Sequence, residues 1–264
     1  AGAYAYAIFT QEPPSGLDQY WFGFDMPWYI GFIAAGFASL LFALITGWPT
    51  LRLRGEYLAL TTFAFAEVFH SVLLNERRIG NGSVGLANVE RPDPMNLGLN
   101  EAVGYALAAV ALMLITAWLF NRLLKSPFGR AIDAVHDDET AAQAVGKDDT
   151  RIRLQVFIIS AIPIGFAGAL YAMITTLVAP ALFTAEITFF IWIALALGGE
   201  KTILGAILGT MALVLFQEIV GAIPFETVRV AQIAASAEEI VTGILFITVL
   251  RLRPWEKISK GQSA

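Results

Sequence analysis

The sequence predicts an all-α protein, a polytopic bundle of about seven to eight membrane-spanning helices. Three observations indicate this fold. Of the 264 residues, 57% are hydrophobic and only 15% are charged, with a mean hydropathy of +0.66. Apolar runs recur at the length of roughly 20 residues that a bilayer core about 30 Å thick requires. Lysine and arginine gather in alternate loops between these runs. We interpret residues 1–264 as a single transmembrane domain.

The composition also excludes several kinds of site. The chain has no cysteine, which rules out disulfides, zinc–thiolate sites and iron–sulfur clusters. Its two histidines, His70 and His136, are too far apart in sequence to suggest a metal-ligand pair. The length leaves no room for a second soluble domain of ordinary size. The chain opens AGAYAYAIFT, without a methionine or a basic segment, so we expect its natural beginning to be missing.

Seven candidate spans follow one another along the chain. The first is bounded by Trp28 and Trp48, aromatic residues suited to the two membrane interfaces. The fifth is short for a span and ends in two glycines. The seven candidates are residues 27–48, 57–75, 101–124, 154–179, 187–199, 203–220 and 239–250. We expect residues 1–10 to be the remainder of an earlier span.

The distribution of basic residues predicts the orientation. Alternating the seven spans places residues 50–56, 125–153, 200–202 and the C-terminus on one side of the membrane. Together with Arg122 at the end of the third span, that side holds 13 of the 17 lysines and arginines. The other side holds only Arg77, Arg78, Arg91 and Arg229. Because loops rich in positive charge stay in the cytoplasm, we assign the first side to the cytoplasm.

Two of the loops are long. Residues 76–100 are rich in glycine, asparagine and proline and are expected to face outward. Residues 125–153 are expected to face the cytoplasm. Within them, Gly129 to Val145 lacks proline and is rich in alanine, which predicts a short helix capped by Gly146. Its position is typical of a docking element. The alternative is an ordinary solvated connector helix.

The cytoplasmic loop also carries a family resemblance. The run Glu139-Thr140-Ala141-Ala142 with Gly146 is similar to the Glu-x-Ala-Ala-x-x-x-Gly coupling motif of ABC importer permeases. Around it, SPFGRAIDAVHDDETAAQAVGKDDTRIRLQVFIISAIPIGFAGALYA resembles the branched-chain amino acid permeases of the LivM type. The blocks LRLRGEYLALTTFAFAEVFHSVLLN and LALGGEKTILGAILGT are similar to two further stretches of that family. The opening AGAYAYAIF resembles a point inside the family, after its first spans.

The resemblance implies a division of labour between chains. A permease of this family pairs with a sister permease and is driven by two cytoplasmic ATPase subunits, and a periplasmic binding protein delivers the substrate. ATP and Mg²⁺ would be bound by the ATPases, since this chain has no phosphate-binding loop of the Gly-x-x-x-x-Gly-Lys-Ser/Thr type. The chain would be a transporter subunit in the bacterial inner membrane, without enzymatic activity or cofactor, and no nucleic-acid partner is expected.

Carried over onto this sequence, the motif assigns ATPase coupling to a few residues. They are Glu139, Ala141, Ala142 and Gly146, together with Arg130 in the same loop. Asp133 and His136 depart from the pattern, because relatives more often have basic residues there.

Glu67 and His70 are candidates for a pathway or gate. They are three residues apart in a predicted helix, share a face and are close enough to interact. Ionisable groups inside a membrane normally face the bundle interior or a wet cavity. The alternative is a buried pair that holds two helices together.

Small residues form another pattern. The break at Gly198 and Gly199 suggests irregular backbone lining a cavity, so both glycines are also pathway candidates. In contrast, Gly205-x-x-x-Gly209 and the series Ala161, Gly165, Gly168 are typical of close helix packing.

The leading hypothesis is an ABC importer permease for branched-chain amino acids or a related small polar solute. Importers of urea and short amides are an alternative within the same family. A proton-coupled secondary transporter, with Glu67 and His70 as its relay, is an alternative from another class. A membrane scaffold without transport activity is a third, but it does not explain the coupling motif.

Overall fold

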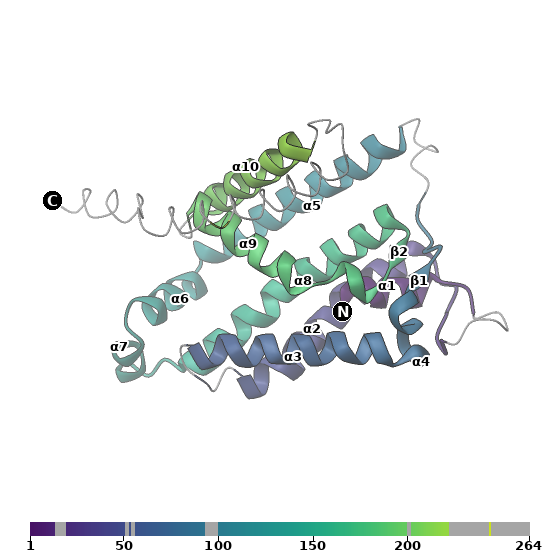
Figure 1. Cartoon of the computed structure of the whole chain (residues 1–264). Helices are drawn as coiled ribbons and strands as arrows, with labels where there is room; N and C mark the ends of the chain where they lie inside the picture. Colours follow the sequence, from purple (N-terminus) through teal and green to yellow (C-terminus); the bar gives the residue numbers. More distant parts are fainter. Residues whose placement is uncertain are drawn as a thin grey trace. The chain divides into compact units, whose positions relative to one another are not determined.

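The computed structural model describes residues 1–13, 20–50, 53, 56–92, 100–199, 202–221 and 243 (Figure 1). It divides into two compact units, residues 1–183 and 184–264, and each is described by itself. The larger unit contains the N-terminal helices and the two long loops, residues 76–100 and 125–153. The smaller unit contains a helical hairpin.

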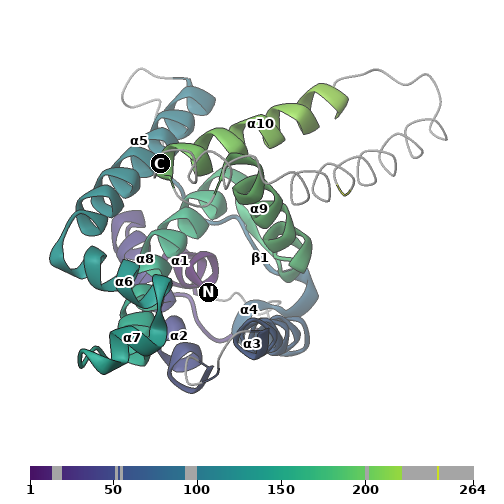
Figure 2. The same cartoon turned by 90° about the vertical axis from the view of Figure 1, so that its left-hand side faces the viewer.

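Three helices form the core of the larger unit. The short α1 (Gly2–Thr10) packs against both α2 (Trp28–Thr50) and α8 (Asp149–Thr175), which also pack against each other. Figure 2, viewed towards the end that carries α7, shows α1 beside α8. Because lipid provides no hydrophobic drive between helices, such contacts depend on close packing of small residues.

The closest approach of these helices is at Gly165. A Cβ atom there would lie 2.5 Å from the Ser39 hydroxyl oxygen and 2.6 Å from the Ala35 carbonyl oxygen, both on α2. A Cβ atom on Gly2 would lie 2.6 Å from the Gly165 Cα atom. All three backbones therefore meet at this crossing, and the predicted packing role of Gly165 is confirmed.

Hydrogen bonds tie the end of α1 to the segment that precedes α2. The N–H groups of Phe24 and Met26 donate to the Ile8 and Phe9 carbonyl groups in the last turn of α1, and the Asp25 N–H donates to the carbonyl group of Gln11, the next residue after the helix. The buried Tyr6 donates from its hydroxyl to the Glu90 carbonyl at 2.8 Å. The bonds from Phe24 and Met26 satisfy carbonyl groups that have no intrahelical partner at the end of α1.

A small cap covers this end of the unit. It contains α4 (Arg77–Gly80), the 3₁₀ turns η1 (Gly82–Val84) and η3 (Pro180–Leu182), and an antiparallel pair of short strands. Strand β1 (Leu86–Ala87) pairs with β2 (Leu177–Val178), with Leu86 opposite Val178. The cap therefore joins the loop after α3 to the segment after α8.

Two helices lie outside the core. They are α3 (Glu56–Asn75), which contacts α2, and α5 (Glu101–Leu124), which contacts α8. No residue of the most apolar window of α5 is buried, and almost none of that in α3 is. These faces are available for lipid or for other chains.

The opposite end of the larger unit carries α6 (Pro127–Asp137) and α7 (Glu139–Ala144). Figure 1 shows these helices at one end and α4, β1 and β2 at the other. The unit thus has two differently built ends connected by α2, α3, α5 and α8.

The described part of the smaller unit contains a hairpin of α9 (Ala185–Gly198) and α10 (Ile203–Gly221). Glycines again set the helix contact. A Cβ atom on Gly198 would overlap the Gly205 carbonyl oxygen, and one on Gly209 would lie 2.6 Å from the Gly198 nitrogen. The predicted packing role of Gly205 and Gly209 is confirmed.

The predicted all-α, multi-pass membrane bundle is confirmed. In the described part of the chain, five helical segments are long and apolar enough to cross a membrane. They are Trp28–Thr50, Tyr57–Asn75, Glu101–Leu124, Asp149–Thr175 and Pro180–Gly198. The sixth candidate corresponds to α10, a shorter apolar helix, and the seventh, 239–250, lies outside the described residues except for Gly243.

One predicted span was displaced. We expected residues 154–179, but α8 begins at Asp149 because the Asp148 side chain caps it, accepting from the Arg151 N–H at 3.0 Å. It ends at Thr175 because Thr176 adopts a left-handed conformation with φ of 53°, and the chain then enters β2.

We expect Gly165→Val to destabilise the larger unit by about 1–3 kcal/mol, because the added methyl groups have no space at the three-helix crossing. Ala167→Val, at an exposed position of the same helix, is the matched control. Thermal unfolding of both purified variants in detergent measures the difference. Equal midpoints for the two variants would contradict this packing role.

Candidate functional sites

The helix predicted from Gly129 to Val145 is in fact two helices. Helix α6 begins with Ser126 as its cap, whose hydroxyl accepts from the Phe128 and Gly129 N–H groups. It ends before Asp138, where the backbone becomes extended. The continuous helix was therefore wrong, because Asp138 favours a helix start over a helix interior.

Asp138 begins α7. Its carboxylate accepts from the Thr140 hydroxyl at 2.6 Å and from the Ala141 N–H at 3.0 Å. These hydrogen bonds hold the pKa of Asp138 below its ordinary value, since they favour the charged form. The capping contribution is therefore present at neutral pH and is lost as the pH falls through that lowered pKa.

Gly146 ends α7 as predicted. Its φ of 80° is left-handed, and its N–H donates to the Gln143 carbonyl at 2.9 Å. The Lys147 N–H donates to the Ala142 carbonyl at 3.0 Å. This pair of bonds is the Schellman arrangement, in which glycine avoids the strain that a side chain would meet. No atom lies within 4 Å of where a Gly146 Cβ would be, so conformation alone requires glycine here.

Side chains attach α7 to the start of α8. Glu139 Oε2 lies 2.8 Å from Arg153 Nη2, and the Gln143 amide donates to Asp149 Oδ1 at 3.0 Å. Arg153 Nη2 also lies 3.9 Å from Asp149 Oδ2. Ala142, only 3% exposed, faces inward between these contacts. Sequence reasoning missed Arg153, Asp149 and Gln143, because only the fold brings the two helices together.

The other side of α7 is free of such contacts among the described residues. Ala141, Ala144 and Lys147 are exposed, and the apolar Val145 is 76% exposed at the tip. Arg130 is exposed on α6 and does not join the contacts between α7 and α8. The α6–α7 segment therefore presents a small, partly apolar tip on a fixed base.

Glu67 and His70 are not brought together. No hydrogen bond or ion pair joins these two described side chains. Instead, the half-buried His70 ring places Nε2 3.1 Å from the Pro180 carbonyl oxygen, which links α3 to η3. Glu67 is exposed on α3. The pathway assignment of both residues stays a prediction.

Gly198 and Gly199 have different placements. Gly198 lies in the packed crossing of α9 and α10, so its backbone is covered by a neighbouring helix. Gly199 follows the helix with φ of 92°, a conformation that favours glycine. This arrangement supports packing and turning roles for the two glycines, and their place in a pathway stays a prediction.

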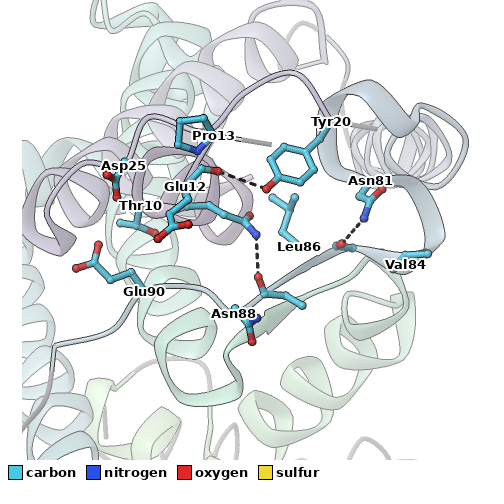
Figure 3. Close-up of a pocket in the computed structure, with 13 residues that line it drawn as sticks. Thr10, Glu12, Pro13, Tyr20, Asp25, Asn81, Val84, Leu86, Asn88 and Glu90 are labelled. Carbon is cyan, nitrogen blue, oxygen red and sulfur yellow. Dashed lines mark hydrogen bonds between the residues drawn. The ribbon is translucent and has the colours of Figure 1, made fainter. Parts of the chain in front are cut away.

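A polar cavity of about 750 Å³ lies beside the cap (Figure 3). Glu12, Asp25 and Glu90 line it, and no lysine or arginine is among the described lining residues. Gln11 spans it by donating to the Ala87 carbonyl at 2.7 Å. The carboxylates attract cationic groups, although no metal-binding cluster occurs among the described residues.

Backbone conformation around this cavity is unusual. Asp25, Asn81 and Asn88 line it and have left-handed φ values of 47°, 61° and 55°. Aspartate and asparagine adopt this conformation more readily than other residues with side chains. The loop of residues 76–100, which we expected to face outward, thus contributes a specifically folded surface, whereas the three carboxylates were not identified from the sequence.

These features define a class of protein: a multi-pass α-helical membrane protein with a structured helical projection at one end and a polar cap at the other. A family model described as "Branched-chain amino acid transport system / permease component" matches residues 1–250. The chain belongs to this family of branched-chain amino acid transport permeases, so the resemblance noted in the sequence is confirmed.

Relatives support the same conclusion. The chain is 31% identical over 241 residues to the high-affinity branched-chain amino acid transport system permease protein LivM of Salmonella typhimurium and to that of Escherichia coli. In both cases the match covers 83% of this chain and 54% of the relative. A probable branched-chain amino acid transport permease protein LivM from Methanocaldococcus jannaschii is 26% identical over 219 residues, which cover 78% of this chain and 61% of the relative.

The chain spans about half the length of the two bacterial relatives. These relatives are permease components of transport systems and not enzymes. No solved structure matches the chain.

We expect Asp138→Ala to loosen α7, because the N–H of Ala141 loses its acceptor. Hydrogen exchange of peptides covering residues 138–146 should accelerate about three- to tenfold. Asp137→Ala removes a neighbouring carboxylate that does not cap α7 and should leave exchange unchanged. Equal acceleration by both substitutions would contradict the capping role.

Proposed function

We propose that this chain is a membrane-spanning permease subunit of an ATP-driven importer in the bacterial inner membrane. It forms half of a pathway for branched-chain amino acids or a related small polar solute. Its partners are a sister permease, two cytoplasmic ATPase subunits that bind ATP and Mg²⁺, and an external binding protein. Family membership supports this proposal, and the observation that carries it is the attachment of α7 to α8.

The α7 tip is suited to mechanical coupling. Its exposed face carries small side chains and Val145, which an ATPase subunit can approach closely. Its base is held to α8 by Glu139–Arg153 and Gln143–Asp149. A displacement of the tip by an ATPase therefore acts on α8 directly.

Helix α8 carries that displacement to the other end of the unit. Its 27 residues extend about 40 Å, enough to cross a bilayer core. At its far end, the Thr176 carbonyl accepts from the Val89 N–H at 3.2 Å, and β2 pairs with β1. We place docking of the binding protein at this cap, where the acidic cavity offers a site for basic side chains.

The exposed Glu67 carboxylate is the reason to place a partner chain or a pathway beside α3. A charged side chain in a membrane-spanning helix costs about 2.5–3.5 kcal/mol by insertion scales when it faces lipid. Glu67 is exposed on its helix and has no ion-pair partner in the described ranges. We place the sister permease or a wet pathway against this face.

The proton-coupled alternative receives less support. Its proposed relay requires transfer between Glu67 and His70, whereas His70 contacts the Pro180 carbonyl. The urea or short-amide alternative concerns only the solute. Competition of unlabelled leucine, urea and acetamide against radiolabelled leucine uptake distinguishes these substrates.

We expect Gly146→Val to reduce coupled uptake about tenfold, because the left-handed conformation is strained for a β-branched residue and the α7 tip is displaced. Gly146→Asn is the matched control, since asparagine tolerates this conformation and the site has space. The measurement is ATP-driven uptake by the complete complex in proteoliposomes. Equal uptake by both variants would contradict a coupling role for the tip.

We expect Glu67→Gln to reduce uptake about tenfold while the complex assembles normally, because the pathway loses a negative charge. A tenfold slower uptake corresponds to a transport barrier that is higher by about 1.4 kcal/mol. Glu76→Gln removes an exposed carboxylate just beyond the end of the same helix and serves as the control. Uptake and subunit stoichiometry are measured on the same preparations. Loss of assembly in step with uptake would instead indicate a structural role for Glu67.

A further inference from the structure

Two contacts between α7 and α8 form a ladder with two rungs, and the Glu139 and Asp149 carboxyl groups also interact between the rungs. Glu139 and Gln143 are four residues apart on α7, and Asp149 and Arg153 are four residues apart on α8. Residues at this spacing lie on one face of a helix. The first rung is Glu139 to Arg153 at 2.8 Å, and the second is Gln143 to Asp149 at 3.0 Å.

The ladder is partly withdrawn from water. The side chains of Arg153, Glu139 and Asp149 are 26%, 28% and 12% exposed. Ala142 is buried next to them, which lets the two helices approach closely. A charge left alone here would lose its partner without regaining full hydration.

This geometry changes the role expected for Glu139. The motif resemblance implies that Glu139 couples to the ATPase, yet its Oε2 atom is directed at α8 of the same chain. The groups directed away from the chain are at the tip, where Val145 is 76% exposed. A partner approaching α7 therefore meets the tip first.

We infer that Arg153 and Asp149 are positioning residues that fix α7 on α8, and that Glu139 acts within this chain and not on the ATPase. The inference rests on the proposed function, since it states how the coupling segment is held. In this assignment, the ladder transmits a displacement of α7 to α8, and the exposed tip around Val145 recognises the partner.

Charge exchange tests the first rung. Glu139→Arg and Arg153→Glu are each expected to lower ATP-driven uptake about tenfold, while the ATPase still co-purifies. The combined exchange E139R/R153E is made together with Asp149→Asn, which removes a like charge from beside the carboxylate introduced at position 153 yet keeps the acceptor for Gln143. Uptake by this triple variant should return to within about threefold of the unmodified complex. Arg151→Glu, an exposed charge reversal on the same turn of α8, should change uptake by less than about twofold.

A second measurement is made on the isolated chain in detergent. Hydrogen exchange in residues 139–146 should accelerate in each single variant and recover in the triple variant. Gel filtration of every variant confirms that the remainder of the chain is folded. This measurement needs no ATPase, so it tests the ladder separately from the proposed function.

The outcomes are distinct. The inference is overturned if Arg153→Glu leaves exchange and uptake unchanged, or if Glu139→Arg releases the ATPase and the triple variant does not restore it. The second result would mean that Glu139 contacts the ATPase itself. If the unmodified chain retains no ATPase although the ladder variants accelerate exchange, the proposed function fails and the ladder stands.

Discussion

The rest of the structure depends on the crossing of three backbones at Gly165. Helices in a bilayer gain little from burying apolar surface against one another, so their association relies on close contact and on hydrogen bonds. Gly2 on α1 and Ser39 on α2 both meet α8 at this glycine, where a Cβ atom has no space. The crossing holds α1 in the core, and α1 in turn provides the Tyr6 hydroxyl that binds the Glu90 carbonyl of the cap.

Helix α8 connects this core to both ends of the unit. Its N-terminal end is joined to α7 through Asp149 and Arg153, and the residues after it form β2. Elements in such a position transmit displacement only if they are stiff and firmly attached at both ends. The Asp148 cap, the two-rung ladder and the pairing of Leu86 with Val178 supply these attachments.

Helices α3 and α5, at the periphery of the unit, bury little of their surface against the core. Most side chains of α3 and α5 are exposed, as expected where lipid or another chain completes the packing. We propose a protein partner or a wet cavity beside Glu67, because a charge facing lipid is costly, whereas the apolar remainder of α3 is also compatible with lipid. One helix therefore presents both kinds of surface, and the Glu67 carboxylate indicates which face needs a partner.

Features that depend on local patterns were predictable from the residues alone. Apolar length indicated the spans, small residues indicated the crossings at Gly165 and Gly205, and the glycine at 146 indicated the end of α7. These follow from properties of a few neighbouring residues: hydropathy, side-chain volume and permitted φ. The family resemblance also lay in the residues themselves, since motif order does not require a structure.

The contacts between residues distant in sequence depend instead on the fold. The attachment of α7 to α8 through Arg153 joins residues that no local pattern pairs, whereas the helix break itself is set locally by the Asp138 cap. His70 was expected to interact with Glu67, but its ring contacts the Pro180 carbonyl group, 110 residues away in sequence. The acidic cavity likewise combines Glu12, Asp25 and Glu90 from separate segments. Such pairings depend on chain topology and on the balance between alternative partners, and no local pattern contains that information.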